Sequence, residues 1–339
     1  MSKLIILLIS MFMVFTSCDN SIARNGRTIL ISVVSDYTDG TIAYGNDIPD
    51  LGNPPNDQAA IAGQIHELTN GNVELYLYRV ENGERYTAEK VDDISTLFEY
   101  STTVERTINN NKKVTRLKAN LDNWDKTVPF SFQTIAATIQ SLNAEENDLI
   151  IFHYSGHGLE DGTLLLGGDD YDQWGDVNLV NMMTNYNKKA KKVVLLDSCF
   201  SGAHIKDGIL ASSKDFKVAG KAENYVGDSF FKAIAGSWDA ISGKDTYGTP
   251  NTYIMAAASD GQEAFDSFSG ERNQELFGAF SFYLIRALGF DNAELKPQAI
   301  DSRISFYSLY KSIWDSFPSR NKKEQTPMAT LSPFDLVLF

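Results

Sequence analysis

Cysteine and histidine are scarce in this chain, which holds only two cysteines and four histidines among its 339 residues. A single cysteine with one nearby histidine falls short of the four ligands of a structural zinc site. Positive charge is also in deficit, because 30 Lys and Arg face 44 Asp and Glu, a formal net charge of −14. A protein that follows a phosphate backbone needs the opposite balance, so we expect no nucleic-acid partner. The 43% hydrophobic and 12% aromatic content is typical of a globular chain.

Two common functional motifs are absent as well. The chain has no Gly-x-Ser-x-Gly turn, which disfavours a serine hydrolase of that type. The glycine-containing segment 155–158 lacks the lysine and the spacing of a phosphate-binding loop. Beyond the N-terminal segment, no apolar run is long enough to cross a bilayer.

The N-terminus has the features of a targeting segment. Lys3 supplies a positive charge, and residues 4–15 are apolar except for one serine. This run is too short for a membrane-spanning helix and is typical of a signal-peptide core. Thr16-Ser17-Cys18 then resembles the lipobox of bacterial lipoproteins, with Phe15 where that motif usually has Leu. The resemblance implies cleavage before Cys18, a lipid on its sulfur and an exported protein anchored to a membrane of the bacterial cell envelope. An ordinary secretory signal is the alternative.

Lipidation of Cys18 would leave Cys199 without a disulfide partner in the chain. An unpaired thiol in an exported protein is a candidate reactive group. The alternative is a small buried hydrophobic residue, which is how a free cysteine usually behaves. The sequence around Cys199 therefore has to decide between the two.

Strand and helix patterns alternate along the chain. Buried-type strands, rich in β-branched residues, are predicted at 28–34, 73–80, 148–152, 192–196 and 253–257. Amphipathic spacing predicts helices that begin near Asn56 and Ser131, and two more around 277–288 and 306–313. This alternation predicts an α/β sandwich with a mostly parallel sheet.

Two stretches interrupt the alternation. Period-two spacing from Phe98 to Leu117, around an asparagine-rich turn, predicts a hairpin within an insertion at 81–130. Residues 204–250 are rich in Gly, Lys, Ser and Asp, which predicts a linker. We therefore expect a signal peptide at 1–17, a tether at 18–27 and one domain at 28–339, in which the linker separates residues 28–203 from residues 251–339.

Two segments carry the chemistry, His153-Tyr154-Ser155-Gly156-His157-Gly158 and Asp197-Ser198-Cys199-Phe200-Ser201-Gly202. Each follows a buried-type strand, and the carboxyl ends of parallel strands are where ligands and reactive groups gather. If the two strands are neighbours, Cys199 and His157 face one crevice. An imidazole beside a thiol lowers the thiol pKa and later protonates a leaving amine. The flanking glycines offer backbone amides at close range.

Taken together, these segments resemble the caspase-like cysteine peptidases, and most closely the metacaspases and bacterial caspase homologues. The resemblance extends to strand 28–34 with Tyr37, to Asn56-Asp57, and to segments 256–264 and 276–281, and leaves 81–130 unmatched. Phe200 departs from it, since metacaspases usually have His there. The resemblance implies a caspase-like three-layer sandwich, with a mostly parallel central sheet and helices on both faces. Residues 28–203 then correspond to the large-subunit part and residues 251–339 to the small-subunit part.

The resemblance also implies roles for individual residues. Cys199 is the nucleophile, His157 is the general acid and base, and the amides of Gly158 and Cys199 form the oxyanion hole. The remaining histidines are weaker candidates for the base: His153 lies at a strand end where packing is commoner, and His204 falls in the predicted linker. His66 lies on the helix that begins near Asn56, and we expect it at the surface or at the boundary between surface and core.

Substrate preference is expected from charge. Asp57, Ser155 and Asp197 match the positions that line an acidic specificity pocket in metacaspases, which implies cleavage after Arg or Lys. Asp197, which lies two residues before the nucleophile, would repel an acidic side chain of a substrate. Each residue also has a simpler interpretation: Asp57 caps a helix, Asp197 binds backbone amides, and Ser155 is a turn residue.

No cofactor is required for this chemistry. An acidic cluster is a weak candidate for calcium, on which some metacaspases depend, although its spacing fits no EF-hand and an acidic surface loop is the commoner explanation. The cluster consists of Asp169, Asp170, Asp172 and Asp176. Lysines in the predicted linker are candidate self-cleavage sites or simply solvated loop residues: Lys214, Lys217, Lys221, Lys232 and Lys244.

The sequence therefore predicts a cysteine endopeptidase that cuts peptide or protein substrates after Arg or Lys and is held at a membrane by a lipid anchor. One alternative is a catalytically idle lipoprotein of the same fold that serves as a binding or scaffold module. Another is a relative of clostripain or gingipain type with a different specificity.

Overall fold

The computed structural model describes residues 26–38, 42–43, 46–108, 112–159, 162–167, 172–174, 183, 185–202, 251–259, 261–318, 321–330 and 336–339. The predicted signal peptide, Cys18 and the predicted linker lie outside the described residues. Within the described part of the chain, none of the helices combines the length and the apolar character needed to span a bilayer.

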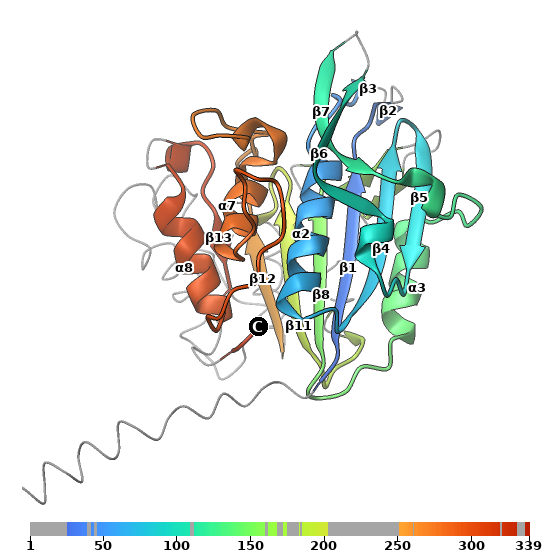
Figure 1. Ribbon diagram of the computed structural model, residues 1–339, viewed down its shortest axis with the longest axis vertical. Helices are drawn as coiled ribbons and strands as arrows, with labels where there is room; N and C mark the ends of the chain where they lie inside the picture. The colour runs from blue at the N-terminus through green and yellow to red at the C-terminus, as the bar shows by residue number, and fades with distance from the viewer. Residues whose placement is uncertain are drawn as a thin grey trace, which may run out of the picture.

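A seven-stranded sheet forms the centre of the molecule (Figure 1). In spatial order, its strands are β13 (Met328–Ala329), β12 (Thr252–Ala256), β11 (Lys191–Asp197), β8 (Leu149–Ser155), β1 (Thr28–Ser35), β4 (Val73–Glu81) and β5 (Glu84–Glu89). The strands from β12 to β4 run parallel, whereas β13 and β5 are antiparallel at the two edges. All predicted buried-type strands lie in this sheet, and β1 and β8 are buried along their whole length, as their runs of apolar residues require.

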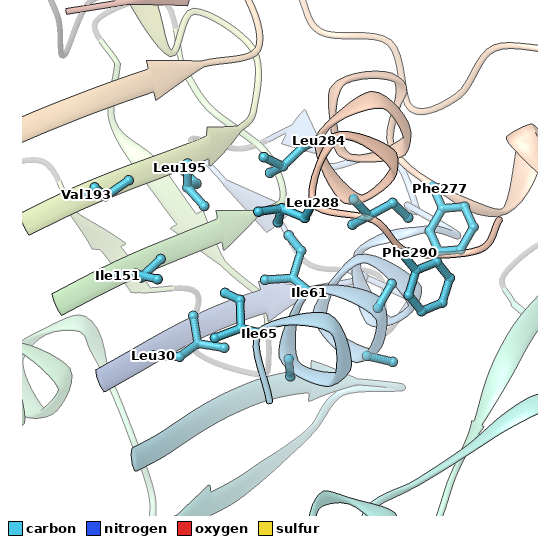
Figure 2. Packing of buried hydrophobic residues seen from close by; sticks show 14 of the residues in the cluster. Leu30, Ile61, Ile65, Ile151, Val193, Leu195, Phe277, Leu284, Leu288 and Phe290 are labelled. Atoms are coloured by element: carbon cyan, nitrogen blue, oxygen red, sulfur yellow. The ribbon is translucent and has the colours of Figure 1, made fainter. Parts of the chain in front are cut away.

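Helices cover both faces of the sheet (Figure 1). On one face lie α2 (Pro54–Leu68), α7 (Ala279–Ala287) and α8 (Phe306–Ser316), and on the other lies α3 (Phe132–Ser141). Ile61 and Ile65 of α2 share a buried cluster with Leu30 and Ile151 of the sheet (Figure 2). The prediction of a three-layer α/β sandwich with a mostly parallel sheet is therefore confirmed.

Local sequence explains where two of these helices begin. Ser131 and Ser305 precede α3 and α8, and each side chain accepts a hydrogen bond from the backbone N–H three residues later. Thr134 and Ser308 return the bond to the capping residue, which completes a capping box at both helices.

Short elements complete the described fold. Three antiparallel pairs lie outside the main sheet: β2 (Ile42–Ala43) with β3 (Asn46–Asp47), β9 (Leu164–Leu166) with β10 (Asp172–Trp174), and β6 (Phe98–Thr107) with β7 (Lys113–Ala119). The 3-10 helices are η1 (Ile94–Thr96), η3 (Leu121–Asn123), η5 (Gln274–Leu276) and η6 (Asn321–Lys323). The β6–β7 hairpin projects from the top of the molecule in Figure 1 and lies where the period-two spacing predicts a hairpin.

A buried ion cluster attaches this hairpin to the sheet. Arg116 of β7 forms ion pairs with Asp36 at 2.9 Å and with Glu81 at 2.5 Å, and Arg79 pairs with Glu81 at 3.0 Å. The Arg79 guanidinium also lies over the rings of Phe98 and Trp124, 5.5 and 5.2 Å from their centroids. Two cations therefore balance two carboxylates, so no charge is left uncompensated in this cluster.

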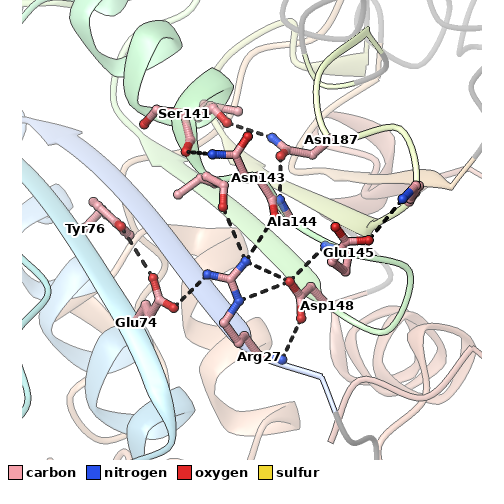
Figure 3. Close-up of polar contacts among 12 residues, drawn as sticks. Arg27, Glu74, Tyr76, Ser141, Asn143, Ala144, Glu145, Asp148 and Asn187 are labelled. Atoms are coloured by element: carbon pink, nitrogen blue, oxygen red, sulfur yellow. Dashed lines mark hydrogen bonds and ion pairs between the residues drawn. The ribbon is translucent and has the colours of Figure 1, made fainter.

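A second polar network lies at the amino-terminal ends of the parallel strands (Figure 3). The Arg27 side chain pairs with Asp148 at 2.9 Å and Glu74 at 3.0 Å, and its backbone N–H donates to Asp148. It also donates to the carbonyl of Leu142 at the end of α3. This network joins the starts of β1, β4 and β8. The parallel pairing of these strands along their length places their carboxyl ends side by side.

Candidate active site

The two predicted chemical segments leave the sheet next to each other. Ser155 at the end of β8 is in register with Asp197 at the end of β11, and the Gly156 N–H donates to the Asp197 carbonyl at 3.2 Å. Because parallel neighbours end at the same edge of the sheet, the residues that follow, His157 and Cys199, enter the same region.

Both side chains line one open pocket of about 400 Å³, a volume that includes the solvent in its mouth. Its walls come from the loop before α2, from α2 itself, from the ends of β8 and β11, and from the segment after β12. The lining residues are Leu51, Pro54, Asp57, Ser155, Gly156, His157, Asp197, Ser198, Cys199, Ala264, Phe265, Asp266 and Gly278. The pocket thus brings together Cys199, His157 and all three predicted specificity residues.

Cys199 lies on a sharp turn directly after β11. The next residue, Phe200, has a left-handed backbone with φ of 55°, which is unusual for a bulky side chain, and its N–H is held by the carbonyl of Gln262 at 2.8 Å. The half-buried Cys199 Sγ accepts a hydrogen bond from the Ala264 N–H at 3.3 Å. Burial raises the pKa of the Cys199 thiol. The hydrogen bond from the Ala264 N–H lowers this pKa, and the charges of Glu263 and Asp197 raise it further. The thiol is therefore protonated at neutral pH and needs a base before it can attack.

His157 has its ring orientation fixed by a backbone carbonyl. Its Nε2 lies 2.7 Å from the carbonyl oxygen of Pro49. A carbonyl only accepts hydrogen bonds, so Nε2 carries the hydrogen and Nδ1 is left as the basic nitrogen. Burial lowers the pKa of His157, which keeps the imidazole neutral at neutral pH. The sequence carries no signal for Pro49, because its contribution is a main-chain oxygen.

Gly158 lies against the peptide group of Cys199. It forms an isolated antiparallel bridge with Leu164, in which the hydrogen bonds are made by the carbonyl of His157 and the N–H of Leu159. The N–H of Gly158 therefore points away from this bridge. A Cβ at Gly158 would overlap the carbonyl oxygen of Cys199, so only glycine fits here.

Two carboxylates converge on the floor of the pocket. Asp57 accepts hydrogen bonds from the Ser155 hydroxyl at 2.6 Å and the Gly278 N–H at 3.0 Å, and Asp197 accepts from the Ser281 N–H at 2.9 Å. A Cβ at Gly278 would overlap Asp197 Oδ2 and would lie 3.0 Å from Asp57 Oδ2. Asp57 lies inside α2 with its side chain in the pocket, so it does not cap this helix. Asp197 does bind a backbone amide, as its simpler interpretation held, but it also faces the pocket.

These carboxylates have no counter-ion among the described residues, where neither forms an ion pair with Lys or Arg. Burial and the charge of Asp197 raise the pKa of Asp57 well above its ordinary range. Burial raises the pKa of Asp197 to about 6. Ionisation of Asp197 opposes ionisation of Asp57, so the two groups titrate as a pair. A cation that entered the pocket would favour the charged form of both carboxyl groups.

Asp266 is a third pocket carboxylate, which the sequence analysis missed. Its carbonyl accepts from the Asn53 side chain at 2.7 Å, and its carboxylate accepts from the Gly52 N–H. Burial raises the pKa of Asp266, and its charge in turn raises the pKa values of Asp57 and Asp197. Asp266 lies two residues beyond the 256–264 segment that carries the resemblance, so no motif marked it.

Asn56 connects this floor to the inserted hairpin. Its side chain donates to the Leu276 carbonyl at 2.7 Å and accepts from the Leu117 N–H of β7 at 2.8 Å. Asn56, the neighbour of Asp57 in the chain, therefore links the hairpin to the segment before Gly278.

The other candidate residues lie elsewhere. His153 is fully buried on β8, hydrogen-bonds to Ser32 at 2.9 Å, and has a pKa lowered by burial to about 3, so it is a core residue. His66 is half-buried in the last turn of α2, and His204 lies outside the described residues. Of the acidic cluster, Asp169, Asp170, Asp176 and the side chain of Asp172 also lie outside them. Among the residues that are described, no group of three or more His, Cys, Asp or Glu is arranged to hold a metal ion.

Comparison with known proteins identifies the family. The family model of the caspase domain matches residues 85–337, well over half of the chain. The chain belongs to the caspase-domain family. This caspase domain is accordingly a caspase-like α/β sandwich in a family of cysteine peptidases. The match begins after β4, so Asp57 and α2 lie outside it.

Solved structures with similar folds include three that span most of this caspase domain. A Geobacter sulfurreducens protein is 16% identical, with 92% of this chain and 97% of that chain covered and a TM-score of 0.44. Caspase-1 from Spodoptera frugiperda is 10% identical (91% and 90% covered, TM-score 0.41). A secreted C11 cysteine protease from Bacteroides thetaiotaomicron is 9% identical (86% and 58% covered, TM-score 0.34). A search of curated proteins finds no significant match.

Proposed function

We propose that this caspase domain is a cysteine endopeptidase that hydrolyses peptide bonds on the carboxyl side of Arg or Lys. The observation that carries the proposal is the shared pocket: a thiol and an imidazole line its wall, and two carboxylates that pair with no Lys or Arg of the described residues converge on its floor. Family membership supports the peptidase chemistry, and the charge of the floor supports a cationic side chain.

Substrate binding begins with the basic side chain in the pocket. The cation pairs with Asp57 and Asp197, and the Ser155 hydroxyl holds the first of these in place. Since Asp197 lies two residues before the nucleophile and its charge raises the pKa of Cys199, neutralisation of that charge lowers the thiol pKa. Occupation of the pocket by a basic residue thus favours the thiolate at the moment that it is needed.

The chemical step follows from the groups at the mouth. His157 Nδ1 takes the thiol proton, and Cys199 Sγ attacks the carbonyl carbon of the scissile bond. The N–H groups of Gly158 and Cys199 stabilise the negative oxygen of the tetrahedral intermediate. The imidazolium then gives its proton to the leaving amine, and a thioester remains. Water, deprotonated by His157, hydrolyses the thioester and restores the free thiol.

The test uses purified residues 19–339 with fluorogenic peptides that end in Arg, Lys or Asp before the reporter group, with and without calcium. We expect turnover of the Arg and Lys peptides, none of the Asp peptide, and loss of turnover in Cys199→Ala and His157→Ala. Asp57→Asn should raise KM for basic peptides, whereas Asp92→Asn, which removes an exposed carboxylate away from the pocket, should not.

No turnover of any peptide by the folded wild-type protein would contradict the proposal and would favour the idle scaffold. Turnover of the Asp peptide in preference to Arg and Lys would contradict the assigned specificity while leaving the peptidase chemistry in place.

We also propose that the chain is lipidated on Cys18 and held at the cell envelope, and that it cuts itself in the 204–250 linker. The lipobox-like Thr16-Ser17-Cys18 supports the first proposal, and the linker lysines support the second. Mass spectrometry tests both: a diacylglyceryl adduct on Cys18, and paired fragments that end at linker lysines in the wild type and are missing from Cys199→Ala.

A further inference from the structure

Two buried tyrosines lie beneath the segment that carries His157. Tyr37 follows β1 and Tyr154 lies in β8, and both side chains are fully buried. The His157 N–H donates to the Tyr37 hydroxyl at 2.9 Å, and the Tyr154 hydroxyl donates to the His157 carbonyl at 2.7 Å. Each phenol also lies 2.6 Å from the Leu165 carbonyl, and the two hydroxyl oxygens are 3.0 Å apart. The tyrosine pair thus contacts both backbone polar groups of the base.

The two hydrogen bonds act on different peptide planes. Tyr37 holds the peptide between Gly156 and His157, and its ring packs against the imidazole with 4.6 Å between centroids. Tyr154 is the side chain that donates to the carbonyl of the peptide between His157 and Gly158, at 2.7 Å, and the Leu165 N–H donates to the same oxygen at 3.2 Å. In a planar trans peptide, the C=O and N–H point in opposite directions, so the direction of this carbonyl sets the direction of the Gly158 N–H.

The local backbone shows that the pair is strongly constrained. Tyr37 has φ of 57°, a left-handed conformation that costs energy for a bulky residue and persists only where the surroundings hold it. At Gly156, a Cβ would come within 2.7 Å of both hydroxyl oxygens, so the segment passes directly over the pair. Neither tyrosine is a lining residue of the pocket. They act through His157 and Gly158, and they are positioning residues.

We propose that Tyr37 and Tyr154 divide the positioning of the catalytic segment: Tyr37 orients the imidazole of His157, and Tyr154 orients the oxyanion-hole N–H of Gly158. This inference rests on the proposed function, in which His157 is the base and Gly158 an oxyanion donor. It predicts that loss of the Tyr37 hydroxyl impairs proton transfer, whereas loss of the Tyr154 hydroxyl impairs stabilisation of the tetrahedral intermediate.

Alkylation of Cys199 by iodoacetamide separates the two roles, because it needs a deprotonated sulfur but forms no oxyanion. A Cys18→Ser background leaves Cys199 as the chain's single thiol. In this background, His157→Ala measures how much the base accelerates alkylation across the pH range. We expect Tyr37→Phe to lose most of that acceleration and to shift the pH profile toward that of His157→Ala. Tyr154→Phe should alkylate at the wild-type rate.

Turnover of an Arg peptide gives the complementary result. Tyr154→Phe should lower kcat by about 10- to 100-fold with KM little changed, somewhat less than the loss of a whole oxyanion donor. Tyr310→Phe is the matched control, because this buried tyrosine of α8 also donates to a backbone carbonyl, that of Pro327 at 2.8 Å, and neither residue lines the pocket. Its kinetics and alkylation should equal those of the wild type.

The outcomes are distinguishable. Wild-type alkylation and turnover in both tyrosine variants would overturn the inference, as would equal losses in all three variants with matching falls in melting temperature. The division of roles would also be overturned if His157→Ala left alkylation unchanged, because no base effect would then exist for Tyr37 to support. A folded wild type without peptidase activity would refute the proposed function, while the alkylation comparison would still test Tyr37.

Discussion

Replacement of Asp197 by Asn should stabilise the protein while it impairs cleavage after basic residues. Asp197 is buried, and among the described residues no Lys or Arg forms an ion pair with it. Its Oδ2 accepts the Ser281 N–H at 2.9 Å, and the amide oxygen of Asn is able to accept the same bond. The substitution therefore removes the ionisable group with little change of shape.

The magnitude follows from the pKa of Asp197, which burial raises from 3.8 to about 6. A shift of about two pKa units corresponds to about 3 kcal/mol. Because the folded-state pKa lies above the unfolded value, the folded protein binds this proton more tightly than the unfolded chain. Stability from this group is therefore fully present below about pH 4, declines as the pH rises through about 6, and is absent above about pH 7. Asn does not titrate, so Asp197→Asn should gain about 3 kcal/mol relative to wild type at about pH 7.5 and almost nothing at about pH 4.

Urea unfolding of both proteins at the two pH values measures this gain, and kinetics on an Arg peptide measures its functional cost. We expect the difference in unfolding free energy to grow with pH while KM for the Arg peptide rises. A difference that is the same at both pH values would refute the electrostatic reasoning. So would a variant that is less stable than wild type at about pH 7.5, where the unpaired charge is expected to cost most.

Three further predictions concern neighbouring features. Gly158→Ala should abolish turnover, because the added Cβ would overlap the Cys199 carbonyl oxygen. A kcat equal to that of the wild type would contradict this close approach of Gly158 to Cys199. Asp266→Asn should raise KM for Arg and Lys peptides with kcat retained, since it removes one negative charge from the pocket; initial rates across substrate concentration measure this. Arg116→Met should destabilise the fold by about 3–5 kcal/mol, because buried Asp36 then loses its ion pair with Arg116 and buried Glu81 keeps only its pair with Arg79. Thermal unfolding checks this value, and an unchanged midpoint would show that the ion cluster contributes little.

The sequence alone determined the layers of the fold and the two chemical segments. The apolar β-branched runs of β1, β8 and β11 and the amphipathic spacing of α3 and α8 are local patterns. The backbone converts them directly into strands buried on both faces and helices with one buried stripe. Cys199 and His157 were recognisable because each carries its chemistry in its own side chain and lies within a motif next to a strand end.

Only the tertiary structure decided how these parts meet. The convergence of Asp57 and Asp197 depends on the order of strands in the sheet and on Gly278, far away in the sequence, whose missing Cβ leaves room for both carboxylates. The contribution of Pro49 is a carbonyl oxygen, which every residue type possesses, so no residue pattern announces it. Periodicity reports which face of an element is buried, whereas contacts between backbone groups and distant side chains are set by the packing of the whole chain.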